Sequence, residues 1–145
     1  MKISKILVPI NGSSFDEDIV RFACDVAKRN KARVYIINVI EVKRTLPLDA
    51  EIPTDLNRGE DILERAEAVA DEASLEVETE LLQARDVGPA IVDEAVERNV
   101  DTIVMGIPYR KRFGEFDAGR TVSYVLKNAP CQVWVLRQAI GPEAQ

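Results

Sequence analysis

The 145-residue sequence contains no histidine. This absence excludes Ser–His–Asp and Cys–His nucleophilic catalysis, histidine acid–base chemistry and most catalytic zinc sites. Its only two cysteines, Cys24 and Cys131, both lie among apolar residues. They are too few and too far apart for a disulfide framework or a CxxC metal site, so we expect two buried thiols and no metal site. Any chemistry is left to carboxylate, lysine, tyrosine or arginine side chains.

Long apolar runs are also missing. No segment approaches the length of a bilayer span, and the first three residues lead into an expected strand rather than a signal sequence. The formal net charge is −6, whereas nucleic-acid binding favours a basic surface. We therefore expect a cytoplasmic protein that binds neither membrane nor nucleic acid. The length suits one domain, which we place at residues 1–138, followed by a polar C-terminal tail at 139–145.

The sequence does contain a regular alternation of apolar and amphipathic segments. The apolar segments predict strands, and the amphipathic segments between them predict helices. Ser14 and Glu17 have the spacing of a capping box for the first helix. Residues 43–58 contain two prolines and no clean period, and they predict a long loop that is either a lid or binding loop or simply disordered. The predicted strands cover 5–10, 33–42, 74–82, 101–106 and 132–136, and two of the predicted helices cover 59–73 and 120–128.

This alternation predicts the α/β class. Successive right-handed β-α-β units form a five-stranded parallel open sheet with helices on both faces. In such sheets a ligand crevice lies beyond the carboxyl ends of the strands, where the strand order reverses. We expect the turn at 11–13, after the first strand, and the loop from Gly106, after the fourth, to form its rims.

The segment 104–136 has the clearest functional signal. A buried strand ends in Gly106, a basic loop follows, and Gly119 opens the last helix. The first-turn N–H groups of a helix have no partner within it, and the helix dipole places partial positive charge there, so this arrangement predicts an anion site. Arg120 begins that helix, and the loop carries Arg110, Lys111 and Arg112.

Several segments together resemble the universal stress protein family, in its single-domain form. They are KILVPINGSS, RVYIINVIEV, DVGPAIVDEAVERNVDTIVMG and GRTVSYVLKNAPCQV, and the resemblance covers nearly the whole chain. It implies the adenine nucleotide alpha hydrolase-like fold with strand order 3-2-1-4-5. It also implies a homodimer in which the last strands of two subunits lie against each other, and a stress role without dedicated catalysis. The expected interface residues are Val133, Trp134 and Val135, although Trp134 in a last strand also suits core packing.

Many members of this family bind ATP through a glycine, two residues, a glycine, nine residues, a glycine and a Ser or Thr. The motif is degenerate here: Gly106 and Gly119 match, but Tyr109 and Arg120 replace the second glycine and the Ser or Thr. Asn11 stands where the family has an aspartate, and its lack of charge weakens the support for Mg²⁺. The resemblance implies ATP or AMP as the ligand, bound by Pro9, Asn11, Val39, Gly106, Tyr109, Gly119, Arg120 and Thr121, with Arg110 and Arg112 on the phosphate side.

The residues leave alternatives open. Arg120 either clamps a phosphate or fills the space that a phosphate needs. In the alternative interpretation, the basic side chains do not bind a ligand. They are solvated charges that pair with Glu115 and Asp117, and they comprise Arg110, Lys111, Arg112 and Arg120. For function, the alternative to a nucleotide-binding stress protein is an interaction module that binds another, unidentified protein. A weak nucleotide hydrolase is disfavoured, because no positioned base is apparent.

Overall fold

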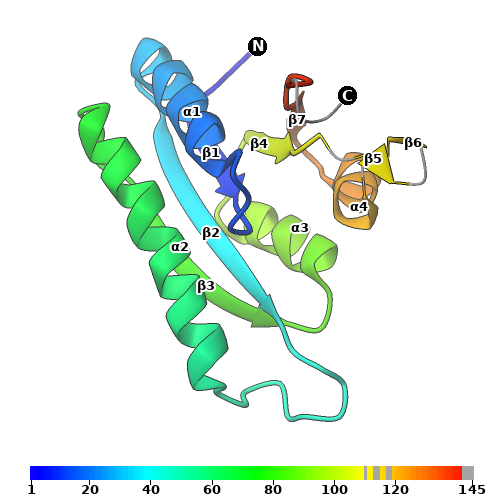
Figure 1. Ribbon diagram of the computed structural model, residues 1–145. Coiled ribbons are helices and arrows are strands. Elements are labelled where there is room, and N and C mark those ends of the chain that lie inside the picture. Colours follow the sequence, from blue (N-terminus) through cyan, green and yellow to red (C-terminus); the bar gives the residue numbers. More distant parts are fainter. Residues whose placement is uncertain (110, 113–114, 117–118, 142–145) are drawn as a thin grey trace.

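The computed structural model describes residues 1–109, 111–112, 115–116 and 119–141. Strands and helices alternate through most of this part of the chain (Figure 1). The strands are β1 (Lys5–Pro9), β2 (Arg33–Glu41), β3 (Glu78–Ala84), β4 (Thr102–Ile107), β5 (Lys111–Arg112), β6 (Glu115–Phe116) and β7 (Gln132–Arg137). The helices are α1 (Asp16–Asn30), α2 (Pro53–Glu72), α3 (Val87–Glu97) and α4 (Arg120–Asn128).

Five parallel strands form the central sheet in the order β3-β2-β1-β4-β7. Because β7 is the fifth strand of this sheet, the predicted order 3-2-1-4-5 is confirmed. Helices α1 and α2 cover one face, and α3 and α4 cover the other (Figure 1). The antiparallel pair β5–β6 lies within the basic loop and was not predicted from the sequence.

The apolar character of β1 follows from burial on both faces. Successive side chains of a strand point to opposite faces of the sheet. Ile6 and Val8 pack in the core under α1 and α2, whereas Leu7 packs in the core under α3 and α4, and all three are fully buried. A parallel strand covered on both sides therefore has a continuous apolar sequence rather than an alternating one.

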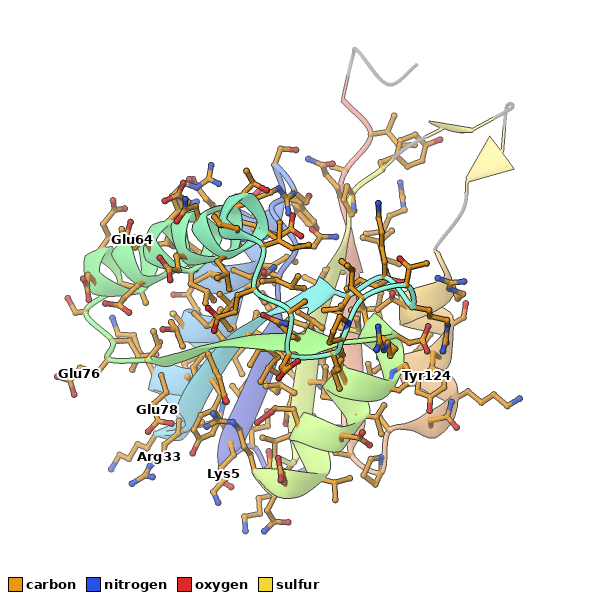
Figure 2. All side chains as sticks on the ribbon, turned by 90° about the horizontal axis from the view of Figure 1, so that it is seen from below. Lys5, Arg33, Glu64, Glu76, Glu78 and Tyr124 are labelled. Carbon is orange, nitrogen blue, oxygen red and sulfur yellow. The ribbon has the colours of Figure 1, made fainter. Side chains whose placement is uncertain are left out.

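The amino ends of the strands are joined by polar side chains. The Asp101 carboxylate accepts hydrogen bonds from the Ser4 hydroxyl (2.6 Å) and the Thr102 hydroxyl (2.9 Å), and Gln132 Nε2 donates to Thr102 Oγ1 (3.0 Å). These bonds connect the starts of β1, β4 and β7. Figure 2 shows Lys5 and Arg33 at this end of the sheet, far from the β5–β6 pair.

A second polar cluster lies on the α3 face near the outer strand β3. The Arg98 guanidinium pairs with the carboxylates of Glu78 (3.1 Å), Glu80 and Glu94 (3.0 Å). It also lies over the Tyr35 ring, 4.7 Å from its centroid. One cation thus links β3, α3 and β2.

Several predicted boundaries were wrong. Helix α2 begins at Pro53 rather than at 59, because proline at the first helical position loses no hydrogen bond. The predicted loop 43–58 is therefore shorter, and Gln83 Nε2 holds it to β3 by donating to the carbonyls of Leu48 and Ala50 (both 2.9 Å). The third strand begins at 78 rather than 74, since Ser74 adopts φ +59° in a turn.

The predicted capping box was also wrong. Helix α1 begins at Asp16 with Phe15 as its N-cap, and Ser13 Oγ instead accepts a hydrogen bond from the Phe15 N–H (3.0 Å). Cys24 is fully buried as expected, but Cys131 is only half-buried. Within the described ranges, no helix has both the length and the apolar content to cross a bilayer. Of the predicted tail, residues 142–145 lie outside the described residues.

Candidate functional site

A cavity of about 290 Å³ lies beyond the carboxyl ends of β1 and β4. The chain leaves β1 toward β2 on one side, while β4 lies on the other, so this is the point where the strand order reverses. Most of its lining is apolar, and the polar side chains are few. The apolar part comprises Pro9, Ile10, Ile19, Val39, Val87, Ile91, Met105, Ile107, Pro108 and Val122; the others are Asn11, Asp16, Gly106, Gly119, Arg120 and Thr121.

The structure brings most of the predicted nucleotide residues together around this cavity. They are Pro9, Asn11, Val39, Gly106, Gly119, Arg120 and Thr121. Tyr109 is not in the lining. Its N–H donates to Gln138 Oε1 (3.2 Å), and its ring lies under the Arg137 guanidinium, 5.2 Å from the ring centroid, so it lies against the end of β7. Arg110 and the side chain of Arg112 lie outside the described residues.

The polar groups of the turn after β1 are hydrogen-bonded. Gly12 has φ +88°, a conformation that favours glycine, and its N–H donates to Asp16 Oδ2 (2.7 Å). Asn11 Oδ1 accepts a hydrogen bond from the Ser13 N–H (3.1 Å), and Arg58 Nη2 donates to the Asn11 carbonyl (3.2 Å). Asn11 Oδ1 and Asp16 Oδ2 thus each accept a hydrogen bond within the turn itself.

Asp16 is a site residue that sequence reasoning missed. An acid in the first helical turn commonly complements the helix dipole, but Asp16 also lines the cavity. Burial raises the pKa of its carboxyl above the usual value, although hydrogen bonds from the N–H groups of the turn oppose that effect. The sequence spacing could have indicated this role, since an acid five residues after Asn11 can fold back onto the same turn.

The N-terminus of α4 forms the opposite wall. Gly119 is the N-cap with φ +86° and ψ +158°, a region essentially restricted to glycine. A Cβ added to Gly119 would meet none of the described heavy atoms within 4 Å. The first-turn N–H groups lack partners within the helix. This wall can accept an anion.

Gly106 has a different physical role. A Cβ at this position would lie 2.5 Å from Cγ1 of Ile19 and 3.0 Å from Cδ2 of Phe15. Glycine therefore allows α1 to pack this closely on β4. This first glycine of the motif shapes the cavity by allowing the helix to approach the strand.

Arg120 lies at a junction of two spaces. It lines the main cavity and also an adjoining groove of about 240 Å³, whose lining includes Glu41, Asp86 and Tyr124. Its side chain is exposed and makes no ion pair with any residue in the described part of the chain. The alternative pairing with Glu115 or Asp117 involves side chains outside the described residues.

The chain matches the model of the universal stress protein family over residues 2–137. It belongs to this family. A putative universal stress protein from Staphylococcus haemolyticus is 33% identical to it over 147 residues, which cover 95% of this chain and 87% of the relative. The family prediction made from the sequence is confirmed.

Solved structures show the same fold. The universal stress protein from Archaeoglobus fulgidus in complex with dAMP has a TM-score of 0.74 and 24% identity, covering 93% of this chain and 98% of that one. A universal stress protein in complex with cAMP has a TM-score of 0.73 and 18% identity, covering 96% of this chain and all of that one. The predicted adenine nucleotide alpha hydrolase-like fold is thus confirmed.

The predicted interface residues lie on the outer strand of the sheet. Val133, Trp134 and Val135 are all half-buried in β7. Trp134 also contacts the Phe22 ring of α1, with centroids 5.8 Å apart and planes tilted by 54°. Its indole therefore packs against the hydrophobic core of the chain.

Proposed function

We propose that this universal stress protein binds an adenine nucleotide, AMP or ATP, in the cavity between β1 and β4. The observation that carries the proposal is the division of the lining into an apolar part and a polar rim that includes the first turn of α4. Ligand sites are typically apolar with a few well-placed polar groups. A purine suits the apolar part, and a phosphate suits a helix N-terminus.

The proposed binding mode uses both walls. The base lies in the apolar part, against Val39 and Met105, and the phosphate lies at the N-terminus of α4, beside Gly119. First-turn N–H groups of α4 donate to the phosphate, and the Arg120 guanidinium supplies a positive charge. The dAMP and cAMP complexes of the two similar structures support an adenine ligand with one phosphate.

The proposed role is binding without dedicated catalysis, in the cytoplasm. Asp16 is the one carboxylate that lines the cavity among the described residues, and its Oδ2 already accepts the Gly12 N–H. A general base must reach the proton that it removes, and Mg²⁺ is usually held by one or two carboxylates together with phosphates. Asn11 supplies no charge for either task, so hydrolysis and strong metal binding are not expected from this wall.

We further propose a homodimer formed through β7. An outer strand presents unpaired backbone groups that can pair with a second copy, and Val133, Trp134 and Val135 lie on this strand. Sedimentation velocity should show a dimer, and Val135→Lys should shift it toward monomer. Only monomer in the wild-type protein would contradict this part of the proposal.

Thermal unfolding with AMP, ADP and ATP, each with Mg²⁺ or with EDTA, tests the nucleotide site. A ligand at one hundred times its Kd adds about 2.7 kcal/mol to the stability of the folded state. Val39→Phe, which fills the apolar part, should abolish the shift, whereas Val96→Phe on the exposed side of α3 should not. If no nucleotide shifts the transition, the cavity is not a nucleotide site, and an interaction module becomes the better hypothesis.

A further inference from the structure

Arg120 differs in kind from the small hydroxyl residue that the family motif has at this position. Guanidinium can donate two parallel hydrogen bonds to a phosphate, and its charge is permanent. Arg120 lines the cavity and makes no ion pair within the described residues. A cation at the rim of an apolar cavity, with no carboxylate partner in the described part of the chain, is available to an anionic ligand.

The geometry favours a side chain that holds a phosphate over one that fills its place. No described heavy atom lies within 4 Å of a Cβ built at Gly119. The cavity of about 290 Å³ exists with Arg120 in its lining, and the Arg120 side chain is exposed rather than buried in it. Arg120 therefore leaves the cavity open rather than filling it.

The groove beyond Arg120 contains carboxylates. Its lining contains the carboxylates of Glu41 and Asp86, and Arg44 pairs with Asp86 at 3.3 Å. Figure 2 shows Tyr124 on α4, and its side chain is packed so close to Gly88 that a Cβ there would lie 2.9 Å from it. A phosphate chain extended into this groove would meet the carboxylates of Glu41 and Asp86.

The opposite wall offers little to a metal ion. Asn11 is uncharged, and its Oδ1 accepts the Ser13 N–H. Asp16 Oδ2 accepts the Gly12 N–H, so binding a metal there would compete with the turn. A nucleotide phosphate in this cavity thus has the Arg120 guanidinium as its protein cation, opposite a wall in which Asn11 Oδ1 and Asp16 Oδ2 already accept hydrogen bonds.

We propose that Arg120 is a specificity-determining residue that replaces a divalent metal ion as the counter-ion of a single phosphate. The site then takes a nucleoside monophosphate without metal, in preference to a metal–polyphosphate complex. This inference rests on the proposed nucleotide function and goes beyond it by naming the ligand class and its metal independence.

Isothermal titration of AMP and ATP, each with Mg²⁺ and with EDTA, tests the inference. Wild type should bind AMP with the same Kd in both buffers, and in EDTA it should bind AMP more tightly than ATP. Arg120→Ser should weaken AMP binding about tenfold, the lower end for a charge-assisted hydrogen bond because this side chain is exposed. Arg120→Lys keeps the charge but cannot donate two parallel hydrogen bonds, so its affinity for AMP should fall about threefold.

Lys127→Ser, on the last turn of the same helix, is the matched control and should bind AMP as wild type does. Circular dichroism of each variant checks that α4 is intact. Equal AMP affinity in wild type and Arg120→Ser would overturn the inference, as would a tenfold gain in AMP affinity on adding Mg²⁺ or tighter binding of ATP than AMP in EDTA. Failure of wild type to bind any nucleotide would instead contradict the proposed function and, with it, this inference.

Discussion

Gly106→Ala tests whether the first glycine of the motif is required for packing. A Cβ at this position would lie 2.5 Å from Cγ1 and 2.8 Å from Cδ1 of Ile19, a side chain that is 2% exposed. Real Cβ atoms essentially never make such contacts, so α1 or the Ile19 side chain must move. Because Ile19 belongs to a close-packed core, that movement lowers the free energy of unfolding.

The expected magnitude is the sum of two opposing effects. Overpacking a core by one methyl group costs about 1–3 kcal/mol. Replacing glycine by alanine at a negative φ restores roughly 0.4–1 kcal/mol by reducing the entropy of the unfolded chain. We therefore expect Gly106→Ala to lower the free energy of unfolding by about 1–2 kcal/mol, measured by urea denaturation at fixed protein concentration.

A double-mutant cycle with Ile19→Ala isolates the contact. Ile19→Ala removes both atoms that a methyl group at position 106 would meet most closely, and it costs about 2–5 kcal/mol alone by leaving a cavity. The new methyl group would partly fill that cavity, so the double variant should be more stable than additivity predicts by at least about 1 kcal/mol. Val125→Ala, in the core on the other face of the sheet, should be additive with Gly106→Ala. Additivity in both cycles would refute the packing argument.

Three further predictions concern other parts of the chain. Gly119→Ala should lower the melting temperature through a cost of about 1–3 kcal/mol, since alanine is strained at φ +86° even though space is available, and an unchanged melting temperature would contradict this conformation. Burial acts to raise the pKa of Asp101, but hydrogen bonds from Ser4, Thr102 and backbone N–H groups outweigh it, so the folded-state pKa is lowered. The stability from ionised Asp101 is therefore complete above its unfolded pKa of about 3.9 and is lost as the pH falls through the folded value. Asp101→Asn should accordingly cost about 1–2 kcal/mol in urea at pH 7 and much less in strong acid, and an equal cost at both pH values would contradict the assignment. Arg98→Met should cost about 2 kcal/mol in urea by leaving Glu94 without its partner, and adding Glu94→Gln should recover part of the loss.

The architecture could be predicted because local patterns and general rules are sufficient for it. Continuous apolar strands such as 33–42 indicate burial on both faces, and right-handed crossovers restrict the strand order. The position of the cavity followed from the same rules, since the ends of β1 and β4 meet where the order reverses. The β5–β6 pair was missed because strands of two residues carry no periodic signal.

Side-chain destinations were harder to predict because they depend on residues distant in sequence. Tyr109 was expected at the nucleotide site from its place in the motif. Its backbone N–H and ring instead contact Gln138 and Arg137 at the end of β7, a strand that lies beside β4 only in the folded sheet. Pro53 shows the same limit locally, since a proline indicates either a loop or the first turn of a helix, and the choice depends on packing of α2.

The two glycines that match the family motif are retained for different physical reasons. Gly106 is needed because a side chain would collide with Ile19, whereas Gly119 is needed because its backbone conformation excludes other residues. Truncation of Ile19 should therefore reduce the cost of substituting the first, and no second-site truncation should reduce the cost of substituting the second. The motif thus combines a packing requirement on one wall of the cavity with a conformational requirement on the other. Arg120, outside the family pattern, adds the charge that neither glycine can supply.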